Sequence, residues 1–334
     1  MKNIAINGFG RIGKNFLRVL FQDPQALKEL KPVAINIGPC DVSHTAYSFK
    51  YDTLLGTFKG DVTMEGDFLV INNHKIKIVR SLDPAELDWK ALDIDWVVEA
   101  SGQFTKRNLA QKHLNAGAKN ILITAPATDE DVTIIPGVNH DCYKPGEHHI
   151  VSLGSCTTNA LAPMLKVLHD NFEIQNAIFT TIHSYTNSQV LLDVEKKEFR
   201  NSRAAALNCI PTTTGASKVI GKILPELDGK TIGSAVRIPL AKVSLLDVVF
   251  TTEKNIDPTI INQAFENAST QDLQNILSIN HEPLVSSDYN ESNESIVIDG
   301  LLTQAQGNMG KVSGWYDNEW AYCQRLKDFL LSTP

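Results

Sequence analysis

Cysteine is scarce in this sequence of 334 residues: five cysteines stand at positions 40, 142, 156, 209 and 323. Their number is odd, the closest two are 14 residues apart (142 to 156), and no CxxC pair occurs. This spacing excludes a disulfide framework and a zinc ribbon, and we expect no metal site. Scattered free cysteines fit a reducing compartment, so the expected location is the cytoplasm.

Long apolar runs and basic clusters are also missing. No apolar run approaches the roughly 18 residues of a membrane-spanning helix, and the N-terminal MKNIAINGFG has too short an apolar stretch for a secretory signal. The chain carries 31 basic and 38 acidic residues, a net charge of −7. Without a run of lysine and arginine, the sequence lacks the signature of nucleic-acid and membrane-surface binders. The expected ligands are small molecules.

Short apolar runs and amphipathic stretches alternate over residues 1–154. The expected strands are 3–6, 32–37, 96–100, 119–124 and 150–153, and the expected helices 11–21 and 105–115. Strands that alternate with helices predict an α/β fold, a doubly wound parallel sheet of the Rossmann type.

The pattern changes after residue 155. A helix is expected over 156–170, followed by β-rich runs at 177–183, 231–238 and 243–252. The last two follow one another without a helix between them, which predicts a second α+β domain on a mostly antiparallel sheet. The long polar connection 184–210 is expected to be functional or to form an interface. A final helix, about 318–331, is expected to return to the first domain.

Residues 8–13 read GFGRIG, a GxGxxG motif between a predicted strand and a predicted helix. Gly8 would make the turn, Gly10 would let the backbone approach a pyrophosphate, and Gly13 would let the helix pack on the strand. The start of the helix then faces the anion. The motif in this context predicts a dinucleotide site.

The usual acid for the ribose 2′-hydroxyl should close the second strand, which here ends in AINIGP. Neither an acidic nor a basic residue stands at its tip, and Asp41 lies a few residues beyond. The residues therefore leave the choice between NAD and NADP open. Asp41 is more simply explained as a turn residue.

The segment SCTTN at 155–159 lies between an apolar strand and an amphipathic helix. At a helix N-terminus, Cys156 would feel the positive end of the helix dipole, so we expect a lowered thiol pKa. His183 closes a predicted strand, a place where catalytic bases often lie. A Cys–His pair beside a dinucleotide loop predicts an aldehyde dehydrogenase, in which a thiolate attacks an aldehyde and hydride leaves to nicotinamide.

An ordered set of motifs runs along nearly the whole chain: INGFGRIG at 6–13, KYD at 50–52, APATDED at 125–131, SCTTN at 155–159, HSYT at 183–186, PTTTGASK at 211–218 and WYDNEW at 315–320. With them the chain resembles the phosphorylating glyceraldehyde-3-phosphate dehydrogenase family. The resemblance implies a Rossmann domain of residues 1–154 plus 318–334 and a catalytic domain of residues 155–317. It also implies a homotetramer with the loop 184–210 at an interface.

The resemblance assigns a role to each site residue. Cys156 would attack the aldehyde and His183 would accept the proton, before inorganic phosphate releases the acyl phosphate. The cofactor contacts would be Gly8, Gly10, Arg11, Ile12, Gly13 and Asn318. The substrate phosphate would be held by Thr186 and Arg237, and the attacking phosphate by Ser155, Thr157, Thr214 and Gly215.

Some residues depart from the family pattern. The NAD-selecting acid aligns near Ile37, and relatives without it often accept NADP. Glu195, in the interface loop, would instead oppose a 2′-phosphate, so NAD or NADP stays unresolved. Ser188 replaces the acid normally found two residues after Thr186. The charges at 195–198 (EKKE) are expected to be a solvated or interface cluster.

Two other functions are compatible with this pattern. One is erythrose-4-phosphate dehydrogenase, a relative that uses water in place of phosphate; the intact Thr186 favours the phosphorylating reaction. The other is a catalytically impaired paralogue with a binding role, against which the retained Cys156 and His183 argue. Aspartate-semialdehyde dehydrogenase ranks lower because its cysteine motif differs from SCTTN.

Overall fold

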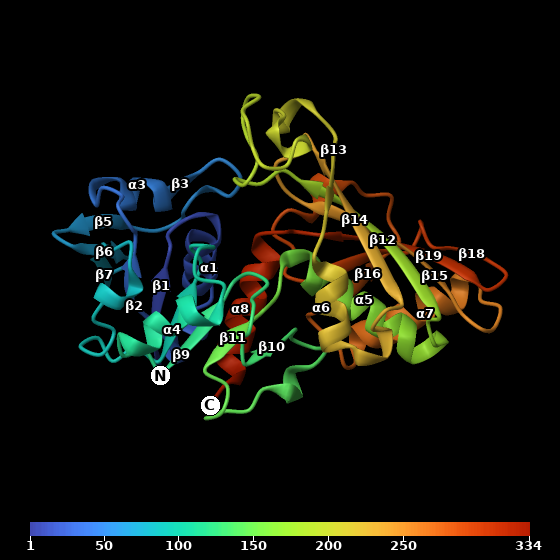
Figure 1. Cartoon of the computed structure of the whole chain (residues 1–334), viewed down its shortest axis with the longest axis horizontal. Helices are drawn as coiled ribbons and strands as arrows, with labels where there is room; N and C mark the ends of the chain where they lie inside the picture. The colour runs from blue at the N-terminus through green and yellow to red at the C-terminus, as the bar shows by residue number, and fades with distance from the viewer. The chain divides into compact units, whose positions relative to one another are not determined.

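The computed structural model describes all residues from 1 to 334, and the chain divides into two units (Figure 1). Unit 1 comprises Met1–Ile134, Asp141–Gly154 and Cys323–Pro334, and unit 2 comprises Ile135–His140 and Ser155–Tyr322. Unit 2 thus keeps residues 318–322, which the sequence analysis assigns to the Rossmann domain. None of the helices combines the length and apolarity that crossing a membrane requires.

Unit 1 is built on a nine-stranded sheet in the order β10-β11-β9-β8-β1-β2-β7-β6-β5. Its strands are β1 (Lys2–Asn7), β2 (Leu30–Asn36), β5 (Val62–Glu65), β6 (Phe68–Ile71), β7 (His74–Val79), β8 (Trp96–Glu99), β9 (Asn120–Ile123), β10 (Val132–Thr133) and β11 (Ile150–Ser152). Every pair from β10 to β7 is parallel, and the two pairs at the β5 edge are antiparallel. The predicted α/β class is confirmed.

The helices of unit 1 are α1 (Arg11–Gln22), α2 (Ala26–Glu29), α3 (Ser43–Lys50), α4 (Arg107–Asn115) and α8 (Trp320–Ser332) from Cys323 onward, beside a small hairpin of β3 (Tyr51–Asp52) and β4 (Gly56–Thr57). The central strands are apolar on both faces: Ile4, Ala5 and Ile6 of β1 are all fully buried. Such strands belong in a sheet that other elements cover on both faces. The carboxyl end of β1 leads directly into the glycine turn.

Unit 2 contains a sheet in the order β13-β14-β12-β15-β19-β17-β16, with β18 paired to β19. Its strands are β12 (Asn176–Ser184), β13 (Ile210–Thr213), β14 (Thr231–Ile238), β15 (Ser244–Thr251), β16 (Leu277–Asn280), β17 (Ile296–Asp299), β18 (Gln304–Gln306) and β19 (Met309–Tyr316). Five of the pairs are antiparallel, and β12/β14 and β16/β17 are parallel. The sheet is therefore mixed, although mostly antiparallel as expected.

Helices α5 (Cys156–Phe172), α6 (Ala216–Ile223) and α7 (Pro258–Thr270) pack on one face of this sheet (Figure 1). Although β14 and β15 are consecutive in sequence, β12 lies between them. The chain returns from β12 through α6 before it forms β14, and a crossover of this kind makes the two strands parallel. This arrangement brings the end of β12 beside the end of β14.

Candidate active site

Cys156 is the first residue of α5, and its neighbour Ser155 is the N-cap. The Ser155 hydroxyl accepts a hydrogen bond from the Thr158 N–H at 3.1 Å, which satisfies one of the free donors at the helix start. The sulfur atom thus sits at the positive end of a 17-residue helix. This placement agrees with the helix position predicted from the sequence.

His183 reaches this thiol from β12, with 3.5 Å between His183 Nε2 and Cys156 Sγ. The other ring nitrogen, Nδ1, lies 2.7 Å from the Ser184 carbonyl oxygen and 2.5 Å from Nη1 of Arg237. Arg237 comes from β14, where it is the register partner of His183. The parallel pairing of β12 with β14 therefore brings base and guanidinium together.

Burial controls the ionisation of both catalytic candidates. Burial raises the pKa of the Cys156 thiol, while the charge of Arg237 and a hydrogen bond from Thr157 act in the lowering direction without prevailing. The lowered thiol pKa expected from the sequence is therefore wrong, because removal from water outweighs the favourable charges. Burial and the Arg237 charge lower the pKa of His183 to about 3. The imidazole is consequently neutral at neutral pH and able to act as a base.

Tyr316 supports this pair from β19 and is absent from the predicted site. Its ring packs edge-on against the His183 ring, with centroids 5.9 Å apart. Its hydroxyl lies 3.0 Å from Thr157 Oγ1 and 2.7 Å from Thr181 Oγ1. The hydroxyl of Thr157, an expected phosphate contact, is thus engaged inside the protein. The tyrosine lies within the WYDNEW motif, but nothing local in the sequence indicates contact with the histidine.

The remaining phosphate candidates lie on loops of unit 2. The Thr186 hydroxyl is 2.9 Å from the Ser188 hydroxyl. Gly215 is the N-cap of α6, and the Thr214 hydroxyl accepts a hydrogen bond from the Ala216 N–H at 3.3 Å. His183 thus contacts both Cys156 and Arg237, whereas Thr186 contacts its own loop.

Asn318 is buried, and its orientation is fixed by two donors. Its Oδ1 accepts from the Ser184 hydroxyl at 2.9 Å and from the Val243 N–H at 3.1 Å. The preceding Asp317 forms a buried ion pair with Lys242 at 2.9 Å. Because the oxygen is occupied, the Asn318 amide N–H₂ is the group that remains for a ligand such as a carboxamide oxygen.

In unit 1 the glycine turn leaves no room for larger residues at two points. Gly8 has φ +97°, and a Cβ there would stand 2.6 Å from the Ser101 backbone. A Cβ on Gly13 would stand 2.2 Å from the Gly8 carbonyl oxygen. These contacts pack the turn against the ends of β1 and β8, as the motif predicts.

The same turn offers an open cradle at its outer side. Nothing lies within 4 Å of a Cβ built on Gly10, which is the N-cap of α1 and has no side-chain cap. The backbone N–H groups of Arg11 and Ile12 open this helix, and the Arg11 guanidinium is paired with Asp52. Uncapped N–H groups beside an empty space fit the pyrophosphate of a dinucleotide.

A buried carboxylate that the sequence analysis does not single out holds this edge of the sheet together. Glu99, at the end of β8, accepts hydrogen bonds from the Ser101 N–H at 2.8 Å and from the Asn7 amide at 2.5 Å. His113 Nε2 lies 3.1 Å from Glu99, and Trp89 donates to His113 Nδ1 at 3.0 Å. The Trp89 donor puts the imidazole proton on Nε2, so His113 donates to Glu99. A charged residue ending the apolar run WVVE is the signal that points to such a role.

The tip of β2 agrees with the sequence-based interpretation of Asp41 as a turn residue. Ile37, where the NAD-selecting acid aligns, is only 7% exposed. Its neighbour Asn36 accepts a hydrogen bond from the Gly38 N–H at 3.2 Å, which shapes the turn. The Asp41 carboxylate accepts from the Ser43 N–H at 2.8 Å and so serves a turn. The Ile37 side chain is therefore buried, and the exposed Asp41 carboxylate shapes the turn that follows.

Comparison with known proteins now decides the family. Residues 2–107 match the family described as glyceraldehyde 3-phosphate dehydrogenase, NAD binding domain, and residues 155–318 match its C-terminal domain. The chain belongs to the glyceraldehyde-3-phosphate dehydrogenase family. Glyceraldehyde-3-phosphate dehydrogenase 1 of Bacillus cereus is 46% identical over 329 residues, 98% of this chain and 97% of the relative. The glyceraldehyde-3-phosphate dehydrogenase of Geobacillus stearothermophilus is 46% identical over 326 residues, 97% of this chain and 96% of the relative.

Membership of the glyceraldehyde-3-phosphate dehydrogenase family confirms the predicted enzyme class. The chain is an oxidoreductase with a nicotinamide-dinucleotide domain and a separate catalytic domain. The family match does not distinguish NAD from NADP. The resemblance drawn from the ordered motifs is likewise confirmed.

Proposed function

We propose that this enzyme oxidises glyceraldehyde 3-phosphate and transfers phosphate to the product, giving 1,3-bisphosphoglycerate. The observation that carries the proposal is the contact between Cys156 Sγ and His183 Nε2 at 3.5 Å, beside the Arg237 guanidinium. A thiol, a neutral base and a phosphate-binding cation are the groups that this reaction needs in one place.

The nucleophile and the base act in sequence. The Cys156 sulfur adds to the aldehyde carbon, forming a thiohemiacetal, and His183 Nε2 takes the hydroxyl proton as the carbonyl re-forms. The bound dinucleotide supplies the chemistry of accepting the hydride. Cys156 is then a thioester; inorganic phosphate attacks its carbonyl carbon, and the thiolate leaves as the acyl phosphate forms. Neutral His183 suits the base role because it is not already protonated.

Arg237 links substrate binding to this base. A guanidinium can only donate, and when Nη1 donates to His183 Nδ1 the imidazole proton lies on Nε2, facing the sulfur. When Arg237 donates to a substrate phosphate instead, Nδ1–H is free to donate to the Ser184 oxygen 2.7 Å away. The lone pair then lies on Nε2, toward the reacting hydroxyl, and the base is in its working form.

The backbone of the glycine turn and one amide would serve the cofactor, and residues at the starts of α5 and α6 would serve the attacking phosphate. Gly8, Gly10, Arg11, Ile12 and Gly13 form the turn for the pyrophosphate. The free amide N–H₂ of Asn318 suits the nicotinamide carboxamide. Inorganic phosphate would be bound by Ser155, Thr157, Thr214 and Gly215.

We further propose a homotetramer in the cytoplasm. The loop 184–210 carries large apolar side chains in solvent, including Phe199 at 90% exposure and Leu191 at 82%, and it extends from the sheet of unit 2 (Figure 1). Exposed apolar side chains gathered on one segment are typical of surfaces that a partner covers. Light scattering coupled to size exclusion tests the state, and a monomer at micromolar concentration would refute it.

The deciding experiment follows reduced nicotinamide formed from glyceraldehyde 3-phosphate. NAD and NADP are supplied in parallel, with and without inorganic phosphate. We expect turnover that requires phosphate, and the ratio of the two rates reports the cofactor preference. Turnover with erythrose 4-phosphate and water alone would instead support the erythrose-4-phosphate reaction. No turnover with either substrate would favour a binding role.

A further inference from the structure

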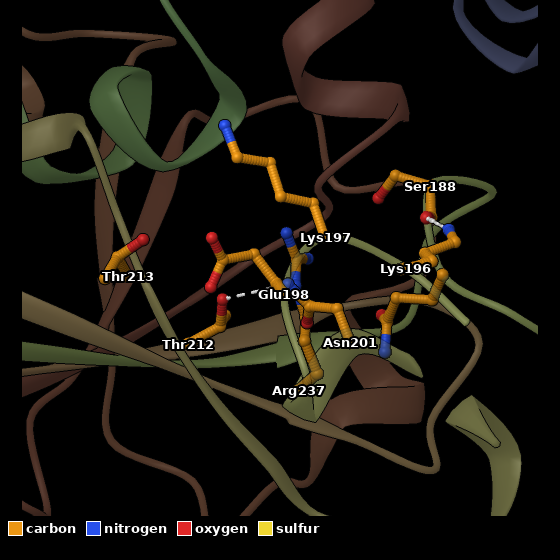
Figure 2. A pocket seen from close by; sticks show the side chains of 9 residues that line it. Ser188, Lys196, Lys197, Glu198, Asn201, Thr212, Thr213 and Arg237 are labelled. Atoms are coloured by element: carbon orange, nitrogen blue, oxygen red, sulfur yellow. Dashed lines mark hydrogen bonds between the residues drawn. The ribbon is translucent and has the colours of Figure 1, made fainter. Parts of the chain in front are cut away.

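Lys242, in the short connection between β14 and β15, is the one lysine of the chain that is buried, with 6% of the residue exposed. The other lysines of unit 2 are at least partly exposed, and two of them, Lys196 and Lys197, line the cavity beside Arg237 (Figure 2). Burying an ammonium group is costly unless an opposite charge accompanies it. An apolar side chain would fill the same space without this cost, so the charge at position 242 points to a role beyond packing.

The partner of Lys242 is the buried Asp317, with 2.9 Å between Nζ and Oδ2. No other polar group accepts a hydrogen bond from Nζ. Asp317 has three further partners in the backbone. Its Oδ2 accepts from the Glu291 N–H at 2.8 Å, and its Oδ1 accepts from the N–H groups of Glu319 at 3.1 Å and Trp320 at 2.9 Å. The carboxylate therefore keeps partners without the lysine, and removing the lysine alone should leave the fold intact.

The residue after Lys242 contacts Asn318, the residue after Asp317. The Val243 N–H donates to Asn318 Oδ1 at 3.1 Å. Val243 is fully buried and has φ +66°, a left-handed conformation that β-branched residues rarely adopt. Such backbone strain persists where surrounding contacts hold it in place. Two consecutive residues of the connection thus contact two consecutive residues at the start of α8.

We propose that Lys242 is a positioning residue for the dinucleotide, because its ion pair with Asp317 keeps the Asn318 amide N–H₂ directed at the nicotinamide carboxamide. The proposal rests on the role proposed above for Asn318. It adds a residue that touches neither the substrate nor the cofactor and acts through its neighbours.

The two ends of the Asn318 amide explain why such positioning is needed. One end accepts hydrogen bonds and the other donates them, and a half-turn of the amide exchanges the two. The Val243 N–H favours the arrangement in which the oxygen faces the connection and the N–H₂ group is left for the ligand. The Lys242–Asp317 pair fixes this N–H beside Asn318, since it joins the two segments one residue away. Without the pair, the amide oxygen can turn toward the carboxamide oxygen, and two acceptors would then face each other.

The test is Lys242→Met, which keeps an unbranched side chain of similar length and removes the charge. Isothermal titration calorimetry compares NAD with ADP-ribose, which has the pyrophosphate and both riboses but no nicotinamide. If the parent binds NADP more tightly than NAD, NADP and 2′-phospho-ADP-ribose are used instead. We expect Kd for the dinucleotide to rise about three- to tenfold, as for the loss of one well-placed hydrogen bond, and Kd for ADP-ribose to stay within about twofold of the parent.

Lys166→Met is the matched control, because Lys166 forms a partly exposed ion pair with Asp170 at 2.7 Å on α5 of the same unit. It should change neither Kd by more than about twofold. Asn318→Ala should show the same selective loss as Lys242→Met. Combining the two should add less than about a further twofold, because the group that the lysine positions is already gone.

Equal weakening of both ligands by Lys242→Met would reduce the lysine to a structural role, and unchanged affinity for both would also overturn the proposal. A selective loss in Asn318→Ala without one in Lys242→Met would refute the role of Lys242 alone. Unchanged dinucleotide affinity in Asn318→Ala would refute the role of Asn318 and this proposal with it. If Lys242→Met does not fold, Lys242→Gln, which keeps a donor toward Asp317, replaces it and is judged by the same comparison. None of these titrations needs turnover, so they remain decisive if the proposed reaction fails.

Discussion

The hydrogen bonds around Glu99 in unit 1 and around His183 in unit 2 differ in how completely they are fixed. At the first edge, Glu99 is surrounded by donors from Ser101, Asn7 and His113, and every one of these bonds is made within the protein. At the second, Nδ1 of His183 faces both a donor and an acceptor. The hydrogen bonds of the first edge are complete without a ligand, whereas the His183 ring can place its proton on either nitrogen.

The difference matches what each region has to do. A cofactor turn benefits from being preorganised, because a ligand then does not have to order it. A catalytic pair has to exchange protons during each cycle, so a single locked arrangement would prevent turnover. Substitutions in the two regions should therefore separate: loss of rate in unit 2, and loss of stability in unit 1.

The largest effect is expected for Cys156→Ser. A hydroxyl is a far weaker nucleophile than a thiol, so kcat should fall by at least about 10³-fold, while the melting temperature stays unchanged. Steady-state rates and thermal unfolding measure the two quantities. Cys142→Ser, at an exposed cysteine outside the loop 184–210, is the control and should keep full activity. Retained turnover in Cys156→Ser would remove the thiol from the mechanism.

His183→Asn should lower kcat by about 10²- to 10⁴-fold, the usual contribution of a general base. Since the pKa of His183 is lowered to about 3, the base form is already present above that pH. The raised thiol pKa of Cys156 means that the thiolate form increases as pH rises through and above neutrality. The kcat/KM profile of the parent should thus rise toward alkaline pH. A step near the ordinary histidine pKa, lost in the variant, would contradict this assignment.

Arg237→Leu tests unit 2 further, because it removes a positive charge that contacts His183 and is proposed to bind the substrate phosphate. We expect KM for glyceraldehyde 3-phosphate to rise about 10- to 100-fold and KM for unphosphorylated glyceraldehyde to change little. With one cause of its lowering gone, the pKa of His183 should move up toward its ordinary range. Arg203→Leu, at an exposed arginine paired with Asp193, is the matched control. Equal KM changes for both aldehydes would show that Arg237 does not bind the substrate phosphate.

Glu99→Gln tests the hydrogen-bond network at the carboxyl edge of the unit 1 sheet. The new amide N–H₂ would face donors from Ser101, Asn7 and His113, so the free energy of unfolding should fall by about 1–3 kcal/mol. Dinucleotide binding should weaken because Ser101 packs on Gly8. Chemical denaturation and cofactor titration measure the two effects. Glu147→Gln changes an exposed carboxylate of unit 1 and should do neither; an equal loss there would make the effect non-specific.

Ile37→Asp should have the smallest effect on function of these substitutions, because it should hardly change the preference between NAD and NADP. Because Ile37 is buried, a carboxylate there would be removed from water, and the expected cost is stability, about 1–3 kcal/mol. The NAD-to-NADP rate ratio should stay within about twofold of the parent. A strong shift toward NAD with unchanged stability would show that position 37 does face the ribose.

Local sequence patterns predicted the nucleotide-binding half well. The periodicity of apolar residues and the spacing of the glycines predicted β1, α1 and the turn between them. These elements depend on residues that are neighbours in sequence. The helix start at Cys156 and the strand end at His183 were predicted for the same reason. The edge strands β5, β6 and β7 were not, since their short mixed runs carry no clear period.

The long-range features were beyond local patterns. The position of β12 between β14 and β15 depends on packing of the whole sheet. The thiol pKa was predicted in the wrong direction because a helix terminus is visible in the sequence, whereas burial of the sulfur is not. Glu99 and Tyr316 act through partners distant in the chain.

The register of β12 against β14 also constrains how the chain can change length. His183 and Arg237 lie side by side because the register of the two parallel strands pairs these two positions. One residue inserted within β14 ahead of Arg237 would turn its side chain to the opposite face of the sheet. An insertion of one residue within the strand would therefore separate Arg237 from His183 and would also turn buried residues of β14, such as Ala235, toward the opposite face, so activity and stability should both fall.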